Sequence, residues 1–223
     1  MDSHSTIPTF AFIIAYAFSF AYAYDPSPVQ DFCVADPKAT VFVNGMACKD
    51  PKLVTVDDFS RSGLNTASSP RAGFPGWNYS AATVEEIAGL NTLGLAMIRN
   101  EFAVGFAIPP HIHPRATEMF LVLQGQVFFG FVTVDPIDSS KSRVFAGNYS
   151  AGDVFVIPQS LIHFGKNIGP EKATTISMFS GQNPGLKIIP AQLFGKDSVI
   201  PVDVLSQSFR VSDEVIGQIR SHF

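Results

Sequence analysis

The sequence predicts an all-β domain, a sandwich or barrel of short strands, followed by two short helices. From Asn91 onward, short runs rich in β-branched and aromatic residues are separated by turn residues such as Gln124-Gly125. Many short strands at this spacing are typical of a sandwich or a barrel. Near the C-terminus the apolar residues recur every three or four positions instead, which is the helical period. A chain of 223 residues suits one large domain of this kind.

The expected strands lie in the second half of the chain. They cover residues 93–98, 102–106, 119–123, 127–134, 143–145, 154–157 and 174–179. Residues 24–90 are rich in Pro, Gly, Ser and Asn, which favours an irregular N-terminal arm wrapped on the domain rather than a separate domain. We therefore expect the barrel itself to occupy residues 91–190.

Two amphipathic helices are expected at the C-terminus, over residues 202–209 and 212–219 within a helical region of about 202–221. Ser212 is a suitable N-cap, and Asp213 and Glu214 follow it in the first turn, where the helix dipole favours acids. These helices could cover one end of the barrel or pack against another subunit.

The N-terminus has the pattern of a secretory signal peptide. The chain is almost entirely apolar from Ile7 to Ala23 and ends in the small-x-small triplet Ala21-Tyr22-Ala23. We expect cleavage of residues 1–23, a mature protein that starts near Tyr24, and a single domain over 24–223. The alternative is a retained membrane anchor, but the run is short for a span and no basic cluster follows it.

The charge pattern excludes a nucleic-acid partner. The formal net charge is −4, and the 15 Lys and Arg residues are scattered along the chain. A nucleic-acid-binding protein would present a basic face. Once the signal peptide is removed, we also expect no association with a membrane.

Secretion changes the interpretation of the two cysteines, Cys33 and Cys48. In an oxidising compartment such a pair favours a disulfide, whereas two buried free thiols would be the better explanation if the chain were not secreted. Secretion also makes two sequons candidate glycosylation sites. These are Asn78, which follows a loop rich in Pro and Gly, and Asn148, which follows Gly147 and is expected in a turn.

His111 and His113 are candidate metal ligands, because residues two apart on an extended segment point to the same side. Glu118 lies five residues beyond His113, an odd offset that would place it on the opposite face of an uninterrupted strand. Pro114 predicts a break between them. A bend there would let the next strand present Glu118 back toward the two imidazoles.

His163 follows a short apolar strand and lies among Leu161, Ile162 and Phe164. An unpartnered imidazole in such surroundings would be costly, so it must be either a hydrogen-bonded core residue or a ligand. Taken alone, neither His163 nor the His-x-His pair decides between a ligand and a structural side chain.

Two motifs resemble the boxes of the cupin superfamily. The first box, Gly-x5-His-x-His-x4-Glu-x6-Gly, is matched at Gly105, His111, His113, Glu118 and Gly125. The second, Gly-x5-Pro-x-Gly-x2-His-x3-Asn, is matched at Gly152, Pro158, His163 and Asn167, with Ser160 in place of its Gly. The run from His113 to Glu118, the segment from Gln30 to Asp36 and Gln182-Asn-Pro-Gly185 resemble the germin subgroup in particular.

The resemblance implies a cupin jelly-roll β-barrel with one metal ion inside, held by His111, His113, Glu118 and His163. It implies a Cys33–Cys48 disulfide and a homohexamer, a trimer of dimers with C-terminal helices at subunit contacts. Three imidazoles and one carboxylate leave positions open on a six-coordinate ion, and carboxylate with water suits manganese. We therefore expect one manganese ion per chain.

The resemblance also bears on the activity. In germins with oxalate oxidase activity, two Asn side chains are thought to hold the substrate, and the corresponding positions here are Ile98 and Ile108. Losing these hydrogen-bond donors should weaken the binding of a small dianion, so oxalate oxidation is not expected. Asn167, from the second box, is a further expected neighbour of the substrate pocket.

Two functions remain open for a secreted protein of the plant apoplast or cell wall. The first is manganese-dependent superoxide dismutation, with a role in defence, which needs an open metal site and access for a small anion. The second is a wall-associated small-molecule-binding or receptor-like protein that uses the same barrel without redox chemistry. Phe128, Phe129 and Phe131 would suit an apolar ligand, but core packing is the favoured explanation of these residues.

Overall fold

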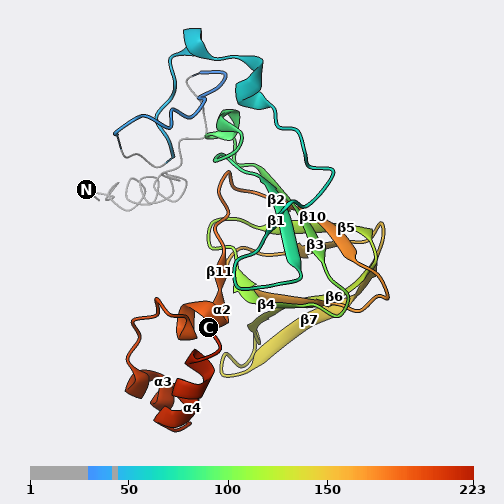
Figure 1. Cartoon of the computed structure of the whole chain (residues 1–223), viewed down its shortest axis with the longest axis vertical. Helices are drawn as coiled ribbons and strands as arrows, with labels where there is room; N and C mark the ends of the chain where they lie inside the picture. Colours follow the sequence, from blue (N-terminus) through green and yellow to red (C-terminus); the bar gives the residue numbers. More distant parts are fainter. Residues whose placement is uncertain (1–29, 42–44) are drawn as a thin grey trace, which may run out of the picture. The chain divides into compact units, whose positions relative to one another are not determined.

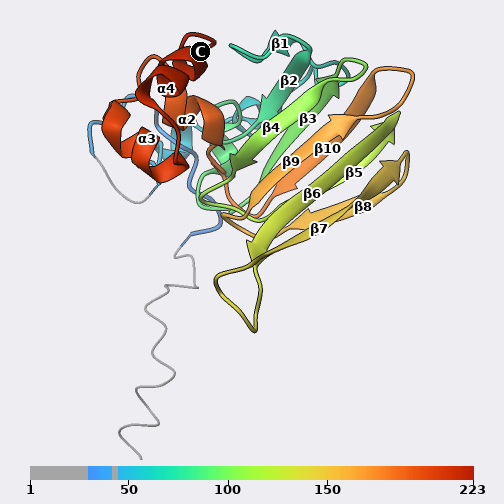
Figure 2. The same ribbon diagram turned by 90° about the horizontal axis from the view of Figure 1, so that it is seen from below.

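Two antiparallel sheets face each other in the computed structural model, which describes residues 30–41 and 45–223 (Figures 1 and 2). One sheet has the spatial order β1 (Ser69–Pro70), β2 (Trp77–Ala82), β3 (Ala96–Phe102), β10 (Ala173–Phe179), β5 (Glu118–Gln124), β8 (Val154–Ile157). The other has the order β11 (Lys187–Ile188), β4 (Ala107–Ile112), β9 (Ile162–Asn167), β6 (Gln126–Val134), β7 (Ser142–Ser150). The expected all-β fold is confirmed, and the expected signal peptide lies outside the described residues.

The core lies between the sheets because alternate residues of each strand point inward. On β5, Glu118, Phe120 and Val122 are buried, and from the facing sheet Val127 and Phe129 of β6 pack into the same cluster. The period-two pattern therefore carries Glu118 to the inner face together with the apolar residues that follow it.

The strands differ from the expectation at several points. Residues 103–106 form the turn between β3 and β4 rather than a strand, with Phe106 N–H donating to the carbonyl of Ala103. The strands β4 and β9 were not expected, because β4 contains two prolines and β9 contains Gly and Lys. Pro109 and Pro110 are accommodated because the pairing of β4 with β9 is irregular between Ile108 and His111.

The described part of the segment 24–90 is less irregular than its composition indicated. It contains β2, which pairs along its whole length with β3, and the short 3₁₀ helices η1 (Pro51–Leu53), η2 (Val56–Phe59) and η3 (Ala88–Leu90). One edge of the first sheet therefore comes from a stretch that we expected to lie outside the barrel.

The disulfide between Cys33 and Cys48 is confirmed. Its loop is fastened by Asn91, which is fully buried. The side-chain amide of Asn91 donates to the carbonyl of Met46 at 2.7 Å, and its oxygen accepts from Met46 N–H at 3.2 Å and from Gln182 Nε2 at 3.2 Å. One side chain thus ties the disulfide loop to the barrel.

Three helices follow the barrel: α2 (Ile189–Phe194), α3 (Val202–Phe209) and α4 (Asp213–Arg220). The expectation for α3 and α4 is confirmed, with Ser212 at the N-cap of α4, and Phe194, Leu205 and Ile216 form their shared core. The helix α2 was not expected, because its six residues are too few for a helical period to show. Within the described residues, no helix has the length and apolar character to cross a bilayer.

Replacing Asn91 with Ala should destabilise the domain. The change leaves both backbone groups of the half-buried Met46 without their partner, at up to about 1–3 kcal/mol for each group that becomes unsatisfied. Thermal unfolding should show a fall of several degrees in the midpoint, at about 2–4 °C per kcal/mol for a chain of this size. An unchanged midpoint would show that the disulfide loop does not depend on this side chain.

Candidate metal centre

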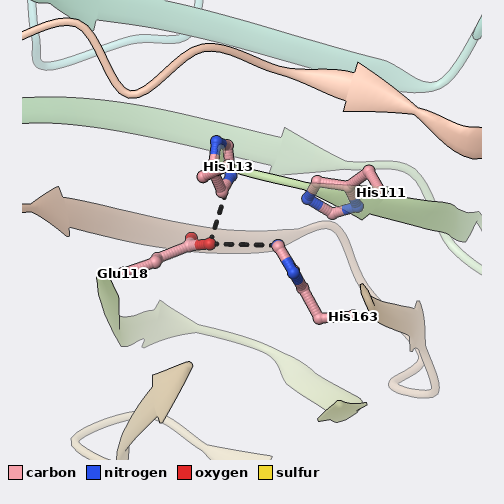
Figure 3. A group of neighbouring side chains, drawn as sticks. All are labelled: His111, His113, Glu118 and His163. Atoms are coloured by element: carbon pink, nitrogen blue, oxygen red, sulfur yellow. Dashed lines mark ion pairs between the residues drawn. The ribbon is translucent and has the colours of Figure 1, made fainter. Parts of the chain in front are cut away.

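Four buried side chains converge between the sheets, as the sequence predicted (Figure 3). His111 lies near the end of β4 and His113 just after it, Glu118 is the first residue of β5, and His163 lies on β9. One ligand atom from each lies within 4.8 Å of the others, and all four residues are at most 7% exposed.

The local structure explains how these residues meet. In the register of β4 with β9, His111 is paired with His163, so the two imidazoles come from directly opposed positions. After His113 the chain turns at Pro114 and Arg115, and β5 begins at Glu118. The bend that the sequence predicted at Pro114 is confirmed.

Backbone carbonyls orient all three imidazoles. Nδ1 of each ring lies within hydrogen-bond distance of one carbonyl oxygen: His111 with Pro109 at 2.8 Å, His113 with Gly185 at 2.6 Å, and His163 with Leu161 at 2.8 Å. A carbonyl can only accept, so each Nδ1 must carry the hydrogen. Each Nε2 is left with a lone pair, which is the form that binds a metal.

At the centre of the cluster, the imidazole nitrogens that face Glu118 carry no hydrogen to donate to its carboxylate. Oε2 of Glu118 lies 3.3 Å from Nε2 of His113 and 3.3 Å from Nε2 of His163 (dashed in Figure 3). With the hydrogens on Nδ1, neither nitrogen can donate to the carboxylate. Glu118 Oε2 and His163 Nε2 are accordingly buried without a hydrogen-bond partner. A cation between them would satisfy both atoms, so the residues present fit a metal ion.

Burial and the neighbouring groups keep this set ready to bind a cation. Burial and the nearby rings of His163 and His113 lower the pKa of His111 from its ordinary 6.5 to about 3. The pKa of Glu118 lies well below its usual range where hydrogens or positive charge at His113 and His163 offset the effect of burial. With the ring hydrogens on Nδ1, a cation at the centre of the cluster takes that role. At neutral pH, His111 is therefore uncharged and Glu118 ionised, the protonation states of metal ligands.

A cavity of about 230 Å³ adjoins His111, His113 and Glu118. Ile98 and Ile108 line it, as expected of pocket neighbours. Asn167 is not among the residues that line this cavity. Its side-chain nitrogen donates to the carbonyls of Phe102, Ala103 and Glu171, and its oxygen accepts from Gly169 N–H. Asn167 therefore holds the ends of neighbouring strands together.

The role of Gly185 was not foreseen. Arg115 donates through Nε to the Asn183 carbonyl and through Nη2 to the Asn183 side chain, both at 2.9 Å. This clamp positions the loop whose Gly185 carbonyl orients His113. A Cβ at Gly185 would lie 2.9 Å from the Arg115 guanidinium. The Gln182-Asn-Pro-Gly185 motif was the signal in the sequence, but nothing in the motif alone linked it to a ligand.

The two sequons are exposed but lie on strands. Asn78 belongs to β2, where it is paired with Pro70 and Glu101. Asn148 belongs to β7 and is paired with Phe128, so the expected turn at this position is wrong. Both side chains are exposed, as glycan attachment requires, and the modification itself stays a prediction.

Comparisons with known proteins agree with this geometry. The cupin family profile matches residues 63–217. Germin-like protein subfamily 1 member 6 of Arabidopsis thaliana is 44% identical over 209 residues, which cover 93% of this chain and 90% of that protein. The chain belongs to the germin-like family of cupins.

Solved structures extend the comparison to the fold of this germin-like protein. An oxalate oxidase structure superposes with a TM-score of 0.80 at 39% identity, over 90% of this chain and 98% of that one. Peruvianin-I, a cysteine peptidase from Thevetia peruviana latex, superposes with a TM-score of 0.67 at 34% identity, over 74% and 98%. The jelly-roll expectation is confirmed by these matches.

Replacing His111, His113 or His163 with Ala should lower the metal content of the purified protein to a small fraction of one ion per chain. Each change removes one of four ligands, and weakly binding divalent ions do not tolerate that loss. Glu118→Gln keeps the shape but removes the only anionic ligand, so it should also lose most of the metal. Elemental analysis of purified protein measures the stoichiometry.

The matched control is His222→Ala, which removes an exposed histidine from the C-terminal tail and should leave the metal content unchanged. Full occupancy in His163→Ala would contradict the assignment of that residue as a ligand.

Proposed function

We propose that this germin-like protein is a secreted manganese protein with superoxide dismutase activity and without oxalate oxidase activity. The observation that carries the proposal is the ligand set: three Nε2 lone pairs and one ionised carboxylate beside a cavity. Such a set can hold a divalent ion and leave coordination positions for a small anion. Superoxide is an anion small enough to reach such a position.

Manganese is the metal that the donors favour. Three imidazoles and one carboxylate would close a tetrahedral zinc site, which is the usual form of structural zinc. The same four ligands leave two positions open on a six-coordinate ion, and a hard carboxylate with water suits Mn²⁺. When bound, manganese supplies the one-electron redox chemistry of the dismutation.

The chain's own residues provide the setting for that chemistry. Glu118 contributes one negative charge to a divalent centre, so the site keeps a net positive charge that attracts an anion. The carbonyls of Pro109, Gly185 and Leu161 hold the rings in one orientation, which limits rearrangement when the metal changes charge.

Oxalate is a poor ligand for this cavity. Ile98 and Ile108 present branched aliphatic side chains on its wall. A dianion placed there would lose hydrogen bonds to water and gain none from these residues, a loss of about 1–3 kcal/mol for each unmade bond. The oxalate oxidase activity of the structural relative is therefore not proposed for this chain.

The peptidase activity of the other relative is not proposed either. A cysteine peptidase needs a free thiolate as its nucleophile. The sequence contains two cysteines, and both are joined in the Cys33–Cys48 disulfide.

A second candidate function is non-redox binding of a small molecule in the same barrel, in a wall-associated or receptor-like protein. The apolar wall formed by Ile98, Ile108, Phe120 and Phe129 favours it, because superoxide needs no such surface. Loss of superoxide in an assay, and its dependence on the metal, separate the two functions.

The remaining proposals concern the mature protein in its compartment. We propose cleavage after residue 23, a single domain over residues 24–223, and residence in the apoplast or cell wall with glycans at Asn78 and Asn148. We also propose a hexamer, a trimer of dimers. The exposed apolar residues of the C-terminal helices, Val204, Phe209 and Val215, support burial between subunits.

The purified protein should remove superoxide at a rate that follows its manganese content. Treatment with a chelator should abolish the activity, and added Mn²⁺ should restore it, because the redox chemistry belongs to the ion. Full removal of superoxide by metal-free protein, or none by protein with one manganese per chain, would contradict the proposed activity. The second result would favour the binding function.

The manganese-loaded protein should release no hydrogen peroxide from oxalate. The double variant Ile98→Asn, Ile108→Asn restores two hydrogen-bonding side chains to the cavity wall and should give measurable oxalate binding by calorimetry. The single variants are the matched controls and should bind more weakly than the double variant. Sustained peroxide production by the unchanged protein would show that two aliphatic neighbours are compatible with oxalate turnover.

A further inference from the structure

Arg71 lines the cavity and has no ion-pair partner among the described residues. It follows the edge strand β1, and its backbone N–H donates to the Trp77 carbonyl, so its side chain leaves on the same side as the indole of Trp77. The guanidinium lies over the ring of Tyr79, 3.8 Å from the ring centre, and 5.0 Å from the centre of the Trp77 ring.

One N–H donor of the Arg71 guanidinium has no hydrogen-bond acceptor. Its Nε is buried and makes no hydrogen bond. Arg71 also forms no ion pair with any carboxylate in residues 30–41 and 45–223. Aromatic faces stabilise a cation only in part, and they leave its in-plane donors unused. A buried, partnerless donor on a cavity wall indicates that the acceptor comes from a ligand.

The cavity wall combines polar side chains with apolar ones, and the apolar part can take the body of a ligand. Ile98, Ile108, Phe120 and Phe129 line the cavity, and the Trp77 indole lines it beside Arg71. The indole is fixed in place, because its Nε1 donates to Asn100 Oδ1 at 3.0 Å and Asn100 Nδ2 donates to Ser177 Oγ at 3.2 Å. An anionic head at Arg71 would therefore have an apolar body beside it.

The size and the charges of the cavity further restrict which ligands can bind. A volume of about 230 Å³ is below the roughly 300–1,000 Å³ of pockets for drug-sized molecules. Glu85 and Glu86 also line the cavity. Glu85 accepts a hydrogen bond from the side chain of Asn183, in the loop that orients His113. These carboxylates would repel a second negative charge on the ligand, so a monoanion is favoured.

We propose that Arg71 is the anion-binding residue of a ligand site in this cavity, which takes a small monocarboxylic acid with an apolar body, of about the size of benzoate. The planar guanidinium matches a carboxylate through paired N–H donors, and the apolar body packs against Trp77 and the isoleucines. The site goes beyond the proposed manganese chemistry, since the head group is held by Arg71 and not by the metal ligands.

The wild-type protein tests this without any substitution. Trp77 is the only Trp in the sequence, so its fluorescence reports on the cavity, and calorimetry provides a second measurement. Benzoate should bind at least about tenfold more tightly than benzyl alcohol, which has the shape without the charge. It should also bind at least about tenfold more tightly than acetate, which has the charge without the body. Equal binding of benzoate and benzyl alcohol, or no binding of benzoate, overturns the proposal.

Arg71→Gln should weaken benzoate binding by about tenfold or more and leave benzyl alcohol binding unchanged, which also shows that the cavity is intact. Arg143→Gln is the matched control. Arg143 likewise lies over an aromatic ring, 4.5 Å from the centre of Phe145, but it is absent from the cavity wall. Its loss should have no effect.

Repeating the titration after chelation separates this site from the metal centre. Metal-free wild-type protein should keep its preference for benzoate, whatever the outcome of the superoxide assay. If chelation abolishes benzoate binding while Arg71→Gln does not, the carboxylate binds at the metal, and the Arg71 site is overturned while the manganese function stands.

Discussion

The ionised carboxylate of Glu118 is buried between two sheets and faces imidazole nitrogens that cannot donate to it. A buried, unpaired charge costs several kcal/mol or more, and proteins rarely keep one without a partner. Here three backbone carbonyls hold the hydrogens of the rings on Nδ1. The polypeptide alone therefore leaves Glu118 Oε2 and His163 Nε2 unsatisfied, and a bound cation is the group that completes the core.

Much of the surrounding structure follows from this constraint. The two prolines before His111 occupy an irregular part of β4, where missing backbone donors cost little. The turn at Pro114 starts β5 at Glu118, and the alternation of β5 then sends Glu118, Phe120 and Val122 to the same inner face. Arg115 fastens the loop that presents the Gly185 carbonyl to His113. Ligands, turn and loop are thus parts of one arrangement.

The sequence predicted features with a fixed period or spacing. The four ligands and the helices α3 and α4 were accessible in this way, because the two cupin boxes and the helical period are local signals. The disulfide followed instead from the expected secretion and from the resemblance to germins. The strands β2, β4 and β9 were missed because Pro, Gly and polar residues mask their pattern, and pairing with neighbours decides their conformation. Asn167 matched a motif, but its bonds to distant backbone groups could be seen only in the structure. No local sequence pattern pointed to Arg71, because its proposed role in anion binding depends on its contacts with Trp77 and Tyr79 and on its place at the cavity.

The cavity next to the metal centre is also lined by residues, among them Arg71, that take no part in binding the metal. His111, His113 and Glu118 line it together with Arg71, Ile98 and Ile108. A site of this kind can bring a small molecule close to a redox ion without using a ligand side chain to bind it. The metal ligands would then support the reaction, and Arg71 would bind the small molecule. A substitution at one of these sites could leave the other intact.

X-ray absorption at the manganese edge of the metal-loaded protein tests the central claim most directly, because imidazole rings give a characteristic multiple-scattering pattern. The structure predicts a spectrum fitted by three imidazole nitrogens, with the remaining ligands oxygen atoms from Glu118 and solvent. A spectrum with oxygen ligands alone, or with fewer than three imidazoles, would contradict the assignment of His111, His113 and His163 as the residues that hold the ion.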